Sequence, residues 1–424
     1  MGYRGDDCLR GSMNKKAAVI GAGISGLYAS LLLEKNGYSV DLYERDCRIG
    51  GRMTSDIKSG FILDRGFHVL QTGYPKASTV FDYESMGCKP FEPGALVIKP
   101  GGTKSKIWRF ADPFRRPISG IIGAFNLFTS PINLARVGLM RIKLSRLKDE
   151  NLFIRESQST YDYLRSKGFS KSFIEKFFTP LFGGIFLESD LRTDSRMFSF
   201  VFKNMSRGNM VLPRDGISAC CNQLYERLQN TTLRLNAEVE VKSDVQLVFE
   251  DTAVNYEVII RAFAPSNAKL TRDVWTAYFS APESPLKGKY IMLNSCVKSS
   301  NQLISHLAVP SDIQPSYSPD SKSLIAVTVV GEDAKKHGLS DKNSVEKAVL
   351  EELSGWFPEH ISSWETLAVQ HVVAALPELS GKHYDELSSN NDSRYCGDYN
   401  YHGSVEGALI SAERAVNNFL QNGA

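Results

Sequence analysis

The sequence has few of the residues and patterns that define several common classes of protein. Its seven cysteines are scattered, no pair has the spacing of zinc ligands, and their odd number does not suggest a disulfide framework. No apolar run reaches transmembrane length; the closest, residues 120–140, is interrupted by Asn126, Pro131, Asn133 and Arg136. These absences predict a cytoplasmic protein in a reducing compartment.

An excess of charge of one sign is also missing. The net charge of +3 over 424 residues is too small to indicate a nucleic-acid partner. The sequence offers no evident Ser/His/Asp triad, Cys/His pair or metal cluster, which favours chemistry carried by a bound cofactor. Residues 1–12 lack the apolar core of a signal peptide and are expected to be a disordered leader. The remaining length predicts two domains.

A glycine-rich turn near the N-terminus is the most informative feature. An apolar run, residues 17–20, precedes the pattern G-x-G-x-x-G at Gly21, Gly23 and Gly26, and an apolar helical segment and a second apolar run follow. In this order of strand, turn, helix and strand, the glycines allow a tight turn, approach of a pyrophosphate and close helix packing. The helix N-terminus, including Ile24 and Ser25, offers N–H groups to the phosphates.

An acid and a second glycine pair follow at useful distances. Glu44 ends the second apolar run, about 20 residues after the turn, where an acid binds ribose hydroxyls. The neighbouring Arg45 leaves open a choice between plain ribose and a 2′-phosphate. Gly50, Gly51 and Arg52 form a loop suited to the other side of the pyrophosphate, because the Arg fork donates two parallel hydrogen bonds.

A second helix N-terminus lies near the end of the chain. Ser404 is a good N-cap, and the apolar residues after it, from Val405 to Phe419, follow helical spacing. Asp398, after Gly397, is placed to bind a polyol hydroxyl. Two helix N-termini and two glycine loops suit FAD better than a nicotinamide cofactor, which has no evident use for the C-terminal site.

These motifs together resemble the flavin amine oxidase, phytoene desaturase and protoporphyrinogen oxidase superfamily, over nearly the whole chain from Met13. The resemblance implies an α/β fold: a Rossmann-type FAD-binding domain with an inserted substrate domain of mixed sheet and helices. The expected FAD-binding domain comprises residues 13–75, 205–265 and 370–424, and the expected substrate domain comprises residues 76–204 and 266–369.

The resemblance also implies roles for particular residues. Val239 would lie at the adenine, and Ser404 and Val405 would lie at the pyrimidine edge of the flavin. A third segment would lie near the flavin ring and comprises Gly66, Phe67, His68 and Val69. Amine oxidases of the superfamily typically carry Tyr at the position of Ser404, so this end looks more like the carotenoid desaturase and isomerase branch. Cys396 does not match the attachment cysteine of some members, which favours non-covalent FAD.

The leading functional hypothesis is FAD-dependent dehydrogenation of an apolar small molecule by hydride transfer to the flavin. An amine oxidase, a redox-neutral isomerase, a non-catalytic flavin-binding protein at a membrane surface and a nicotinamide-only dehydrogenase remain alternatives. No general base is identified; Lys289 and Lys298, on either side of an expected strand, are weak candidates. Residues 107–148 are apolar and basic, which suits either a solvated helical cap or peripheral contact with an anionic membrane.

Overall fold

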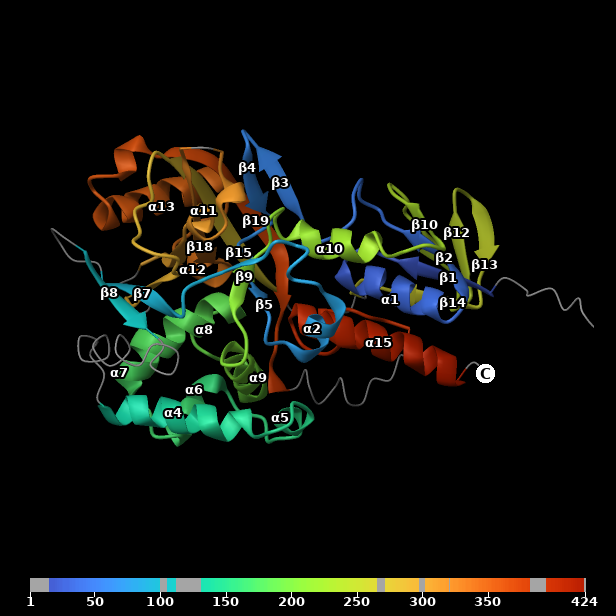
Figure 1. Cartoon of the computed structure of the whole chain (residues 1–424), viewed down its shortest axis with the longest axis horizontal. Coiled ribbons are helices and arrows are strands. Elements are labelled where there is room, and N and C mark those ends of the chain that lie inside the picture. The colour runs from blue at the N-terminus through green and yellow to red at the C-terminus, as the bar shows by residue number, and fades with distance from the viewer. Residues whose placement is uncertain are drawn as a thin grey trace, which may run out of the picture.

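The computed structural model describes residues 15–99, 105–111, 131–264, 271–296, 302–319, 321–381 and 394–422. Figure 1 shows two sheets side by side, with helices packed below and around them. Residues 1–12, Arg115, Arg116 and Lys298, on which some sequence predictions rest, lie outside the described residues.

The first sheet is parallel and has the order β10-β2-β1-β14. Its strands are β1 (Lys15–Ile20), β2 (Tyr38–Tyr43), β10 (Thr231–Arg234) and β14 (Val258–Arg261). Helix α1 (Ile24–Lys35) connects β1 to β2. The predicted order of strand, glycine turn, helix and strand is therefore confirmed.

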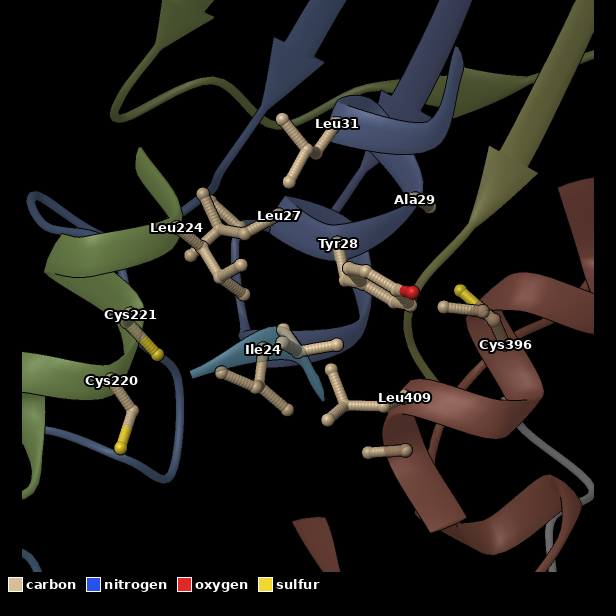
Figure 2. Close-up of a cluster of buried hydrophobic side chains, with 14 of the residues drawn as sticks. Ile24, Leu27, Tyr28, Ala29, Leu31, Cys220, Cys221, Leu224, Cys396 and Leu409 are labelled. Atoms are coloured by element: carbon tan, nitrogen blue, oxygen red, sulfur yellow. The ribbon is translucent and has the colours of Figure 1, made fainter. Parts of the chain in front are cut away.

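Helix α1 is buried between two other helices, α10 (Ser218–Tyr225) and α15 (Val405–Asn422). Figure 2 shows Leu27 of α1 directed toward Leu224 of α10, and Tyr28 of α1 directed toward Leu409 and Cys396. Because α15 lies near the end of the chain and α1 near its beginning, this core joins segments almost 400 residues apart.

A small antiparallel sheet covers the other face of the parallel sheet. It consists of β11 (Glu240–Val241), β12 (Gln246–Phe249) and β13 (Thr252–Asn255). Ala18 and Ile259 of the parallel sheet pack against Leu247 in this layer. The two layers and α1 give the first sheet a buried core on both faces.

The second sheet is mixed and has the order β19-β15-β18-β17-β16-β7-β8. Its strands are β7 (Gly94–Lys99), β8 (Lys106–Ala111), β15 (Thr271–Ala281), β16 (Met292–Asn294), β17 (Ile304–Ala308), β18 (Ser323–Val330) and β19 (Glu365–Pro377). One face packs against α13 (Lys342–Trp356) and α12 (Gly331–Lys336). The other face, which carries Tyr278 and Ala326, packs against β4 (Phe61–Asp64). β19 crosses residue 370, where the sequence predicted a domain boundary.

A helical layer lies below the second sheet in Figure 1. It contains α4 (Pro131–Ser145), α5 (Glu150–Phe153), α6 (Thr160–Ser166), α7 (Lys171–Phe173), α8 (Thr179–Phe186) and α9 (Ser195–Met205), with a π-helical turn at Ile174–Phe178. Phe178, Phe182 and Phe186 are fully buried in its core, so this aromatic run packs the layer. None of the described helices is both long and apolar enough to cross a membrane.

Short elements connect these layers: β3 (Ser55–Lys58), β5 (Leu70–Gln71), α2 (Pro75–Val80), β6 (Lys89–Pro90), β9 (Met210–Leu212) and α11 (Pro310–Ile313). The strand expected between Lys289 and Lys298 is β16, at residues 292–294. Helix α13 begins at Lys342, because Asp341 and Ser344 form a capping box at its start.

Candidate functional site

The glycine turn after β1 is shaped for close approach by a ligand. Gly21 has φ +100°, a conformation that favours glycine. A Cβ on Gly26 would lie 1.8 Å from the Gly21 carbonyl oxygen, so α1 can start here only with glycine. A Cβ on Gly23 would instead meet Gly50 O at 4.0 Å as its nearest described neighbour. No described side chain caps α1, so the N–H groups of its first turn are available to an anion.

Glu44 is buried directly beside this turn. Its two carboxylate oxygens accept hydrogen bonds from the N–H groups of Ala22, at 2.7 Å, and Asp46, at 3.0 Å. Each oxygen retains a further lone pair for a ligand hydroxyl. The N–H of Ala237 donates to the Glu44 carbonyl, which brings the segment leading to Val239 to the same end of β2. Arg45 is exposed.

The second glycine loop lies against the first. The Gly50 N–H donates to the Ala22 carbonyl at 2.9 Å, and Gly23 and Gly50 form an isolated parallel bridge. A Cβ on Gly51 would lie 3.7 Å from the Gly23 Cα. Gly50 and Gly51 both have positive φ, +114° and +58°. The two glycine motifs predicted to share a ligand are therefore adjacent in space.

Arg52 connects this loop to the C-terminal segment. Its guanidinium donates to Asp398 Oδ1 at 2.5 Å and to the Ala375 carbonyl at 2.9 Å. Asp398 is almost fully buried, and its charge raises the pKa of Arg52. The preceding Gly397 donates its N–H to Ser411 Oγ of α15 at 3.1 Å. Residues from opposite ends of the sequence are thus held together by a charged hydrogen bond.

The segment from Gly66 to Val69 lies between this region and the second sheet. Gly66 has φ +87°, its N–H donates to Gln370 Oε1 at 2.9 Å, and its carbonyl accepts from the Tyr278 hydroxyl at 3.1 Å. His68 Nε2 lies 3.0 Å from the Arg65 carbonyl, and burial lowers the pKa of His68. Gly66, at the start of the segment, is therefore fixed by hydrogen bonds to β15 and β19.

The N-terminus of α15 lies next to that of α1. Ser404 Oγ accepts from the Gly407 N–H at 3.1 Å, so the predicted N-cap is confirmed. Ser25 Oγ of α1 donates to the Ala408 carbonyl of α15 at 3.3 Å. Val405, the first residue of α15, packs partly buried against the core around α1. Both predicted helix N-termini consequently lie in one region.

Sequence reasoning missed several residues that build this region. Glu406 accepts from the N–H groups of Lys76 and Ala77 at 2.8 Å each, and so anchors α2; burial raises its pKa. The carboxyl group of Asp64 accepts from the Ile217 N–H at 2.9 Å and from the Tyr317 hydroxyl at 2.9 Å. The available signal was an acid inside a short segment with few other charges, GSVEGA at residues 403–408 and ILDRG at residues 62–66, because such an acid is rarely buried without partners.

Lys289, one of the two lysine candidates, is not brought into this region. Lys289 is exposed, and its carbonyl accepts from the Glu92 N–H near the start of β16. Lys298 lies outside the described residues.

Arg261, a charged residue in the otherwise apolar strand β14, bonds to Asp244 at 3.0 Å and covers the ring of Tyr395 at 5.1 Å. It thereby joins the C-terminal segment to β14.

The residues fit an elongated dinucleotide such as FAD. Gly23 has no Cβ to occupy the space that a pyrophosphate would fill, and the uncapped start of α1 suits phosphate. Glu44 retains lone pairs for a ligand hydroxyl. The described residues contain no group of three or more metal-ligating side chains. The thiol of Cys396 is fully buried, and burial raises its pKa to about 12, so it is a packing group.

Comparison with known proteins agrees with this geometry. The family model described as flavin containing amine oxidoreductase matches residues 24–420. Protoporphyrinogen oxidase 2 of Arabidopsis thaliana is 34% identical over 77 residues, 18% of this chain and 15% of that protein. Hydroxysqualene dehydroxylase of Rhodopseudomonas palustris is 43% identical over 63 residues, 14% of this chain and 15% of that protein. The matched segments therefore cover only a small part of these relatives.

Solved structures share the fold over almost the whole chain. An oxidoreductase from Methanosarcina mazei has a TM-score of 0.71 at 18% identity, with 94% of this chain and 99% of that chain covered. Cyclohexylamine oxidase from Brevibacterium oxydans has a TM-score of 0.70 at 13% identity, with 96% and 99% covered. Together with the family match, the expected α/β fold is confirmed, and the chain belongs to the flavin-containing amine oxidoreductase family of flavin-dependent oxidoreductases.

Proposed function

We propose that the protein is an FAD-dependent dehydrogenase of an apolar small molecule, with FAD held non-covalently. The observation that carries the proposal is that three glycine-containing loops lie close together: Gly23 bridges Gly50, and Arg65, beside Gly66, donates to the Gly51 carbonyl at 3.5 Å. The N–H of Gly66 also bonds to Gln370 of the second sheet. When bound, FAD supplies an acceptor for hydride from a substrate C–H bond.

The cofactor would be held along this line of loops. The N–H groups at the start of α1 and the Gly50–Gly51 loop would bind the pyrophosphate, and Glu44 would bind the adenosine ribose. Asp398, fixed by Arg52, would bind a hydroxyl of the ribityl chain. Gly66 and its neighbours would border the ring system. We accordingly propose that residues 13–75, 205–265 and 370–424 form the FAD domain and that the intervening segments form the substrate domain.

An apolar substrate is favoured by the residues across from this loop. Tyr278 and Ala326 cover this face of the second sheet, and Phe67 contacts the ring of His306. Two relatives of this chain, named 4,4′-diaponeurosporene oxygenase and hydroxysqualene dehydroxylase, carry names that refer to long apolar molecules. Exclusion of water from this apolar region would protect the transferred hydride from exchange with the solvent.

Two other reactions are kept as alternatives. An amine oxidase fits the name of the family, but Ser404, where amine oxidases typically carry Tyr, is engaged in capping α15. A redox-neutral isomerase would use the same cofactor site and the same apolar face, and would differ by returning the flavin to its starting redox state after each turnover.

The test is the anaerobic absorbance of the FAD-loaded protein mixed in turn with polyenes and with amines. Bleaching of the flavin band by polyenes is the expected result. Bleaching by amines alone would replace the proposal with the amine oxidase. Product formation from a polyene without net bleaching would identify the isomerase. Failure to take up flavin would reject the cofactor assignment itself.

We also propose peripheral contact with a membrane through α4. The exposed side of this helix carries Ile132, Ala135, Leu139 and Ile142, which recur at helical spacing and point away from the protein core. Lys143 and Arg146 are exposed beside them. An apolar outer stripe with basic neighbours suits the interface of an anionic bilayer, which would also be a source of apolar substrate.

A further inference from the structure

A row of polar side chains crosses the apolar face of the second sheet. Thr276 of β15 pairs in register with Gln370 of β19 on one side and with Thr328 of β18 on the other. Thr328 in turn pairs with His306 of β17. Residues that are paired in register project from the same face of a sheet, so these four side chains form one line across four strands.

The row is on the face turned toward the Gly66 segment. The opposite face carries Trp275, Val327 and Leu307, which pack against the core under α13. Alternation along each strand therefore places Thr276, Thr328 and His306 on the other side. The residues two positions along, Tyr278 and Ala326, lie in the apolar cluster that contacts β4. The polar row is thus an interruption of an apolar surface.

The two threonine hydroxyls have no partner. Thr276 is 0% exposed and Thr328 is 3% exposed, and neither Oγ1 has a hydrogen-bond partner among the described residues. A buried hydroxyl without a partner loses its hydrogen bonds to water and gains none, which is unfavourable. Valine has the same shape as threonine and would avoid this cost. The described fold gives no reason for this cost, and a ligand oxygen that bonded to the two hydroxyls would remove it.

Contacts at both ends of the row fix where such a ligand would lie. Gln370 accepts from the Gly66 N–H at 2.9 Å, and the rings of His306 and Phe67 have centroids 5.6 Å apart. On the side of α8, a Cβ on Gly184 would lie 2.6 Å from His306 Nδ1. The row therefore lies between the proposed flavin segment and the helical layer, where a substrate must reach the cofactor.

The chemistry of the row selects an uncharged group. A threonine hydroxyl both donates and accepts, as does a neutral imidazole. Burial lowers the pKa of His306 to about 4, so this ring is neutral near pH 7. The row contains no carboxylate, ammonium or guanidinium group to pair with a buried charge. An ammonium or carboxylate ligand would be bound here without compensation.

We propose that Thr276, Thr328 and His306 form a polar subsite that binds a hydroxyl or carbonyl oxygen of an otherwise apolar substrate. The inference rests on the proposed function and narrows its substrate class to apolar molecules that carry an uncharged oxygen. It predicts that a pure hydrocarbon of the same length is a poorer ligand.

The first experiment measures the FAD-loaded protein without substrate. Replacement of the unpaired hydroxyls in Thr276→Val and Thr328→Val should raise the melting temperature by about 2 °C or more each. Thr160→Val is the matched control, because the buried Thr160 hydroxyl donates to the Thr193 carbonyl at 2.7 Å and its loss should lower the melting temperature. A lower melting temperature in the two sheet variants would mean that their hydroxyls are structural, and would overturn the subsite.

The second experiment titrates the FAD-loaded protein with farnesol and with farnesene, and follows the shift of the flavin absorbance band. The wild type should bind farnesol about tenfold more tightly than farnesene, and the Thr276→Val/Thr328→Val variant should lose that preference. Equal affinity of the wild type for the two molecules, or no binding of farnesol, would overturn the subsite.

The affinity for FAD separates this inference from the proposed function. The double variant should bind FAD as tightly as the wild type. A tenfold weaker affinity for FAD would assign the row to the flavin and overturn the subsite while leaving the cofactor site intact. Failure of the wild type to bind FAD would instead reject the proposed function.

Discussion

At the scale of single residues, two of the three glycines in the first turn, Gly23 and Gly26, are required for different reasons. Gly26 is required by the protein itself, since its Cβ would meet a backbone oxygen at 1.8 Å. Gly23 has room for a Cβ within the protein, with its nearest described neighbour at 4.0 Å. A substitution at Gly23 therefore tests the ligand, and one at Gly26 tests the fold.

Gly23→Val should purify as a folded protein that retains less than about a tenth of the flavin of the wild type, because the side chain fills the space of the pyrophosphate. Gly26→Ala should lower the free energy of unfolding by about 3 kcal/mol, because the overlap forces α1 away from β1. The absorbance ratio of flavin to protein and urea denaturation measure the two effects. A full complement of flavin in Gly23→Val would refute the placement of the pyrophosphate.

The buried His306 makes stability depend on pH. Burial lowers its pKa from 6.5 to about 4. Between these values the unfolded chain holds a proton that the folded protein excludes. The stability that the neutral ring of His306 contributes is therefore fully present above pH 6.5 and is lost as the pH falls toward 4. His306→Gln should therefore reduce the loss of unfolding free energy between pH 7 and pH 5 by about 2 kcal/mol.

Urea denaturation of the FAD-saturated protein at the two pH values measures this difference. An unchanged pH dependence in His306→Gln would mean that the ring of His306 has the same pKa in the folded and unfolded states, which would contradict its description as a buried ring with a lowered pKa.

At the scale of elements, α4 carries apolar residues on its exposed side as well as on its buried side. Ile132 is 60% exposed and Leu139 is 57% exposed, while the inner side of the helix packs through Met140 and Leu144. A helix that is apolar on both sides is normally covered by another partner. The sequence could not distinguish a solvated cap from a membrane contact, because both use the same mixture of basic and apolar residues.

Replacing both outward residues, in Ile132→Glu/Leu139→Glu, should reduce co-sedimentation with vesicles containing anionic lipid by about tenfold, since two apolar contacts are lost and two negative charges are added. Ile57→Glu is the matched control: Ile57 is 81% exposed on β3. Equal sedimentation of all three proteins would remove α4 as the contact. A parallel loss in the control would indicate a general effect of charge.

At the scale of the whole molecule, the candidate cofactor site joins the two ends of the chain. The pair of Arg52 and Asp398, the bond from Ser25 to Ala408 and the packing of α15 on α1 all connect the first 60 residues to the last 30. A ligand bound across these contacts stabilises only the folded arrangement. Cofactor binding and global stability are therefore expected to be coupled.

Addition of FAD at about 100 times its dissociation constant should raise the free energy of unfolding by about 2.7 kcal/mol, seen as an increase in melting temperature. Asp398→Ala should bind FAD about tenfold more weakly or worse, since the loss of a charged hydrogen-bond partner frees Arg52 and the loop. At the same FAD concentration, its melting temperature should rise less. An equal rise in the two proteins would mean that the C-terminal loop is structural only.

The sequence by itself determined the features that depend on neighbouring residues. The glycine turn, the acid at the end of β2 and the cap of α15 were predictable, because a tight turn, a strand end and a helix start each impose local backbone requirements on the residues within a few positions. The family resemblance rested on these same local motifs, and the family match over residues 24–420 confirms it.

Only the tertiary structure decided which distant residues meet. The pairing of Arg52 with Asp398 depends on how two loops 346 residues apart are brought together, and the row of Thr276, Thr328 and His306 depends on the register of three strands. Register is set by the packing of a whole sheet and leaves no short pattern in the sequence. The general kind of cofactor was therefore readable from local motifs, whereas the proposed polar subsite for the substrate was not.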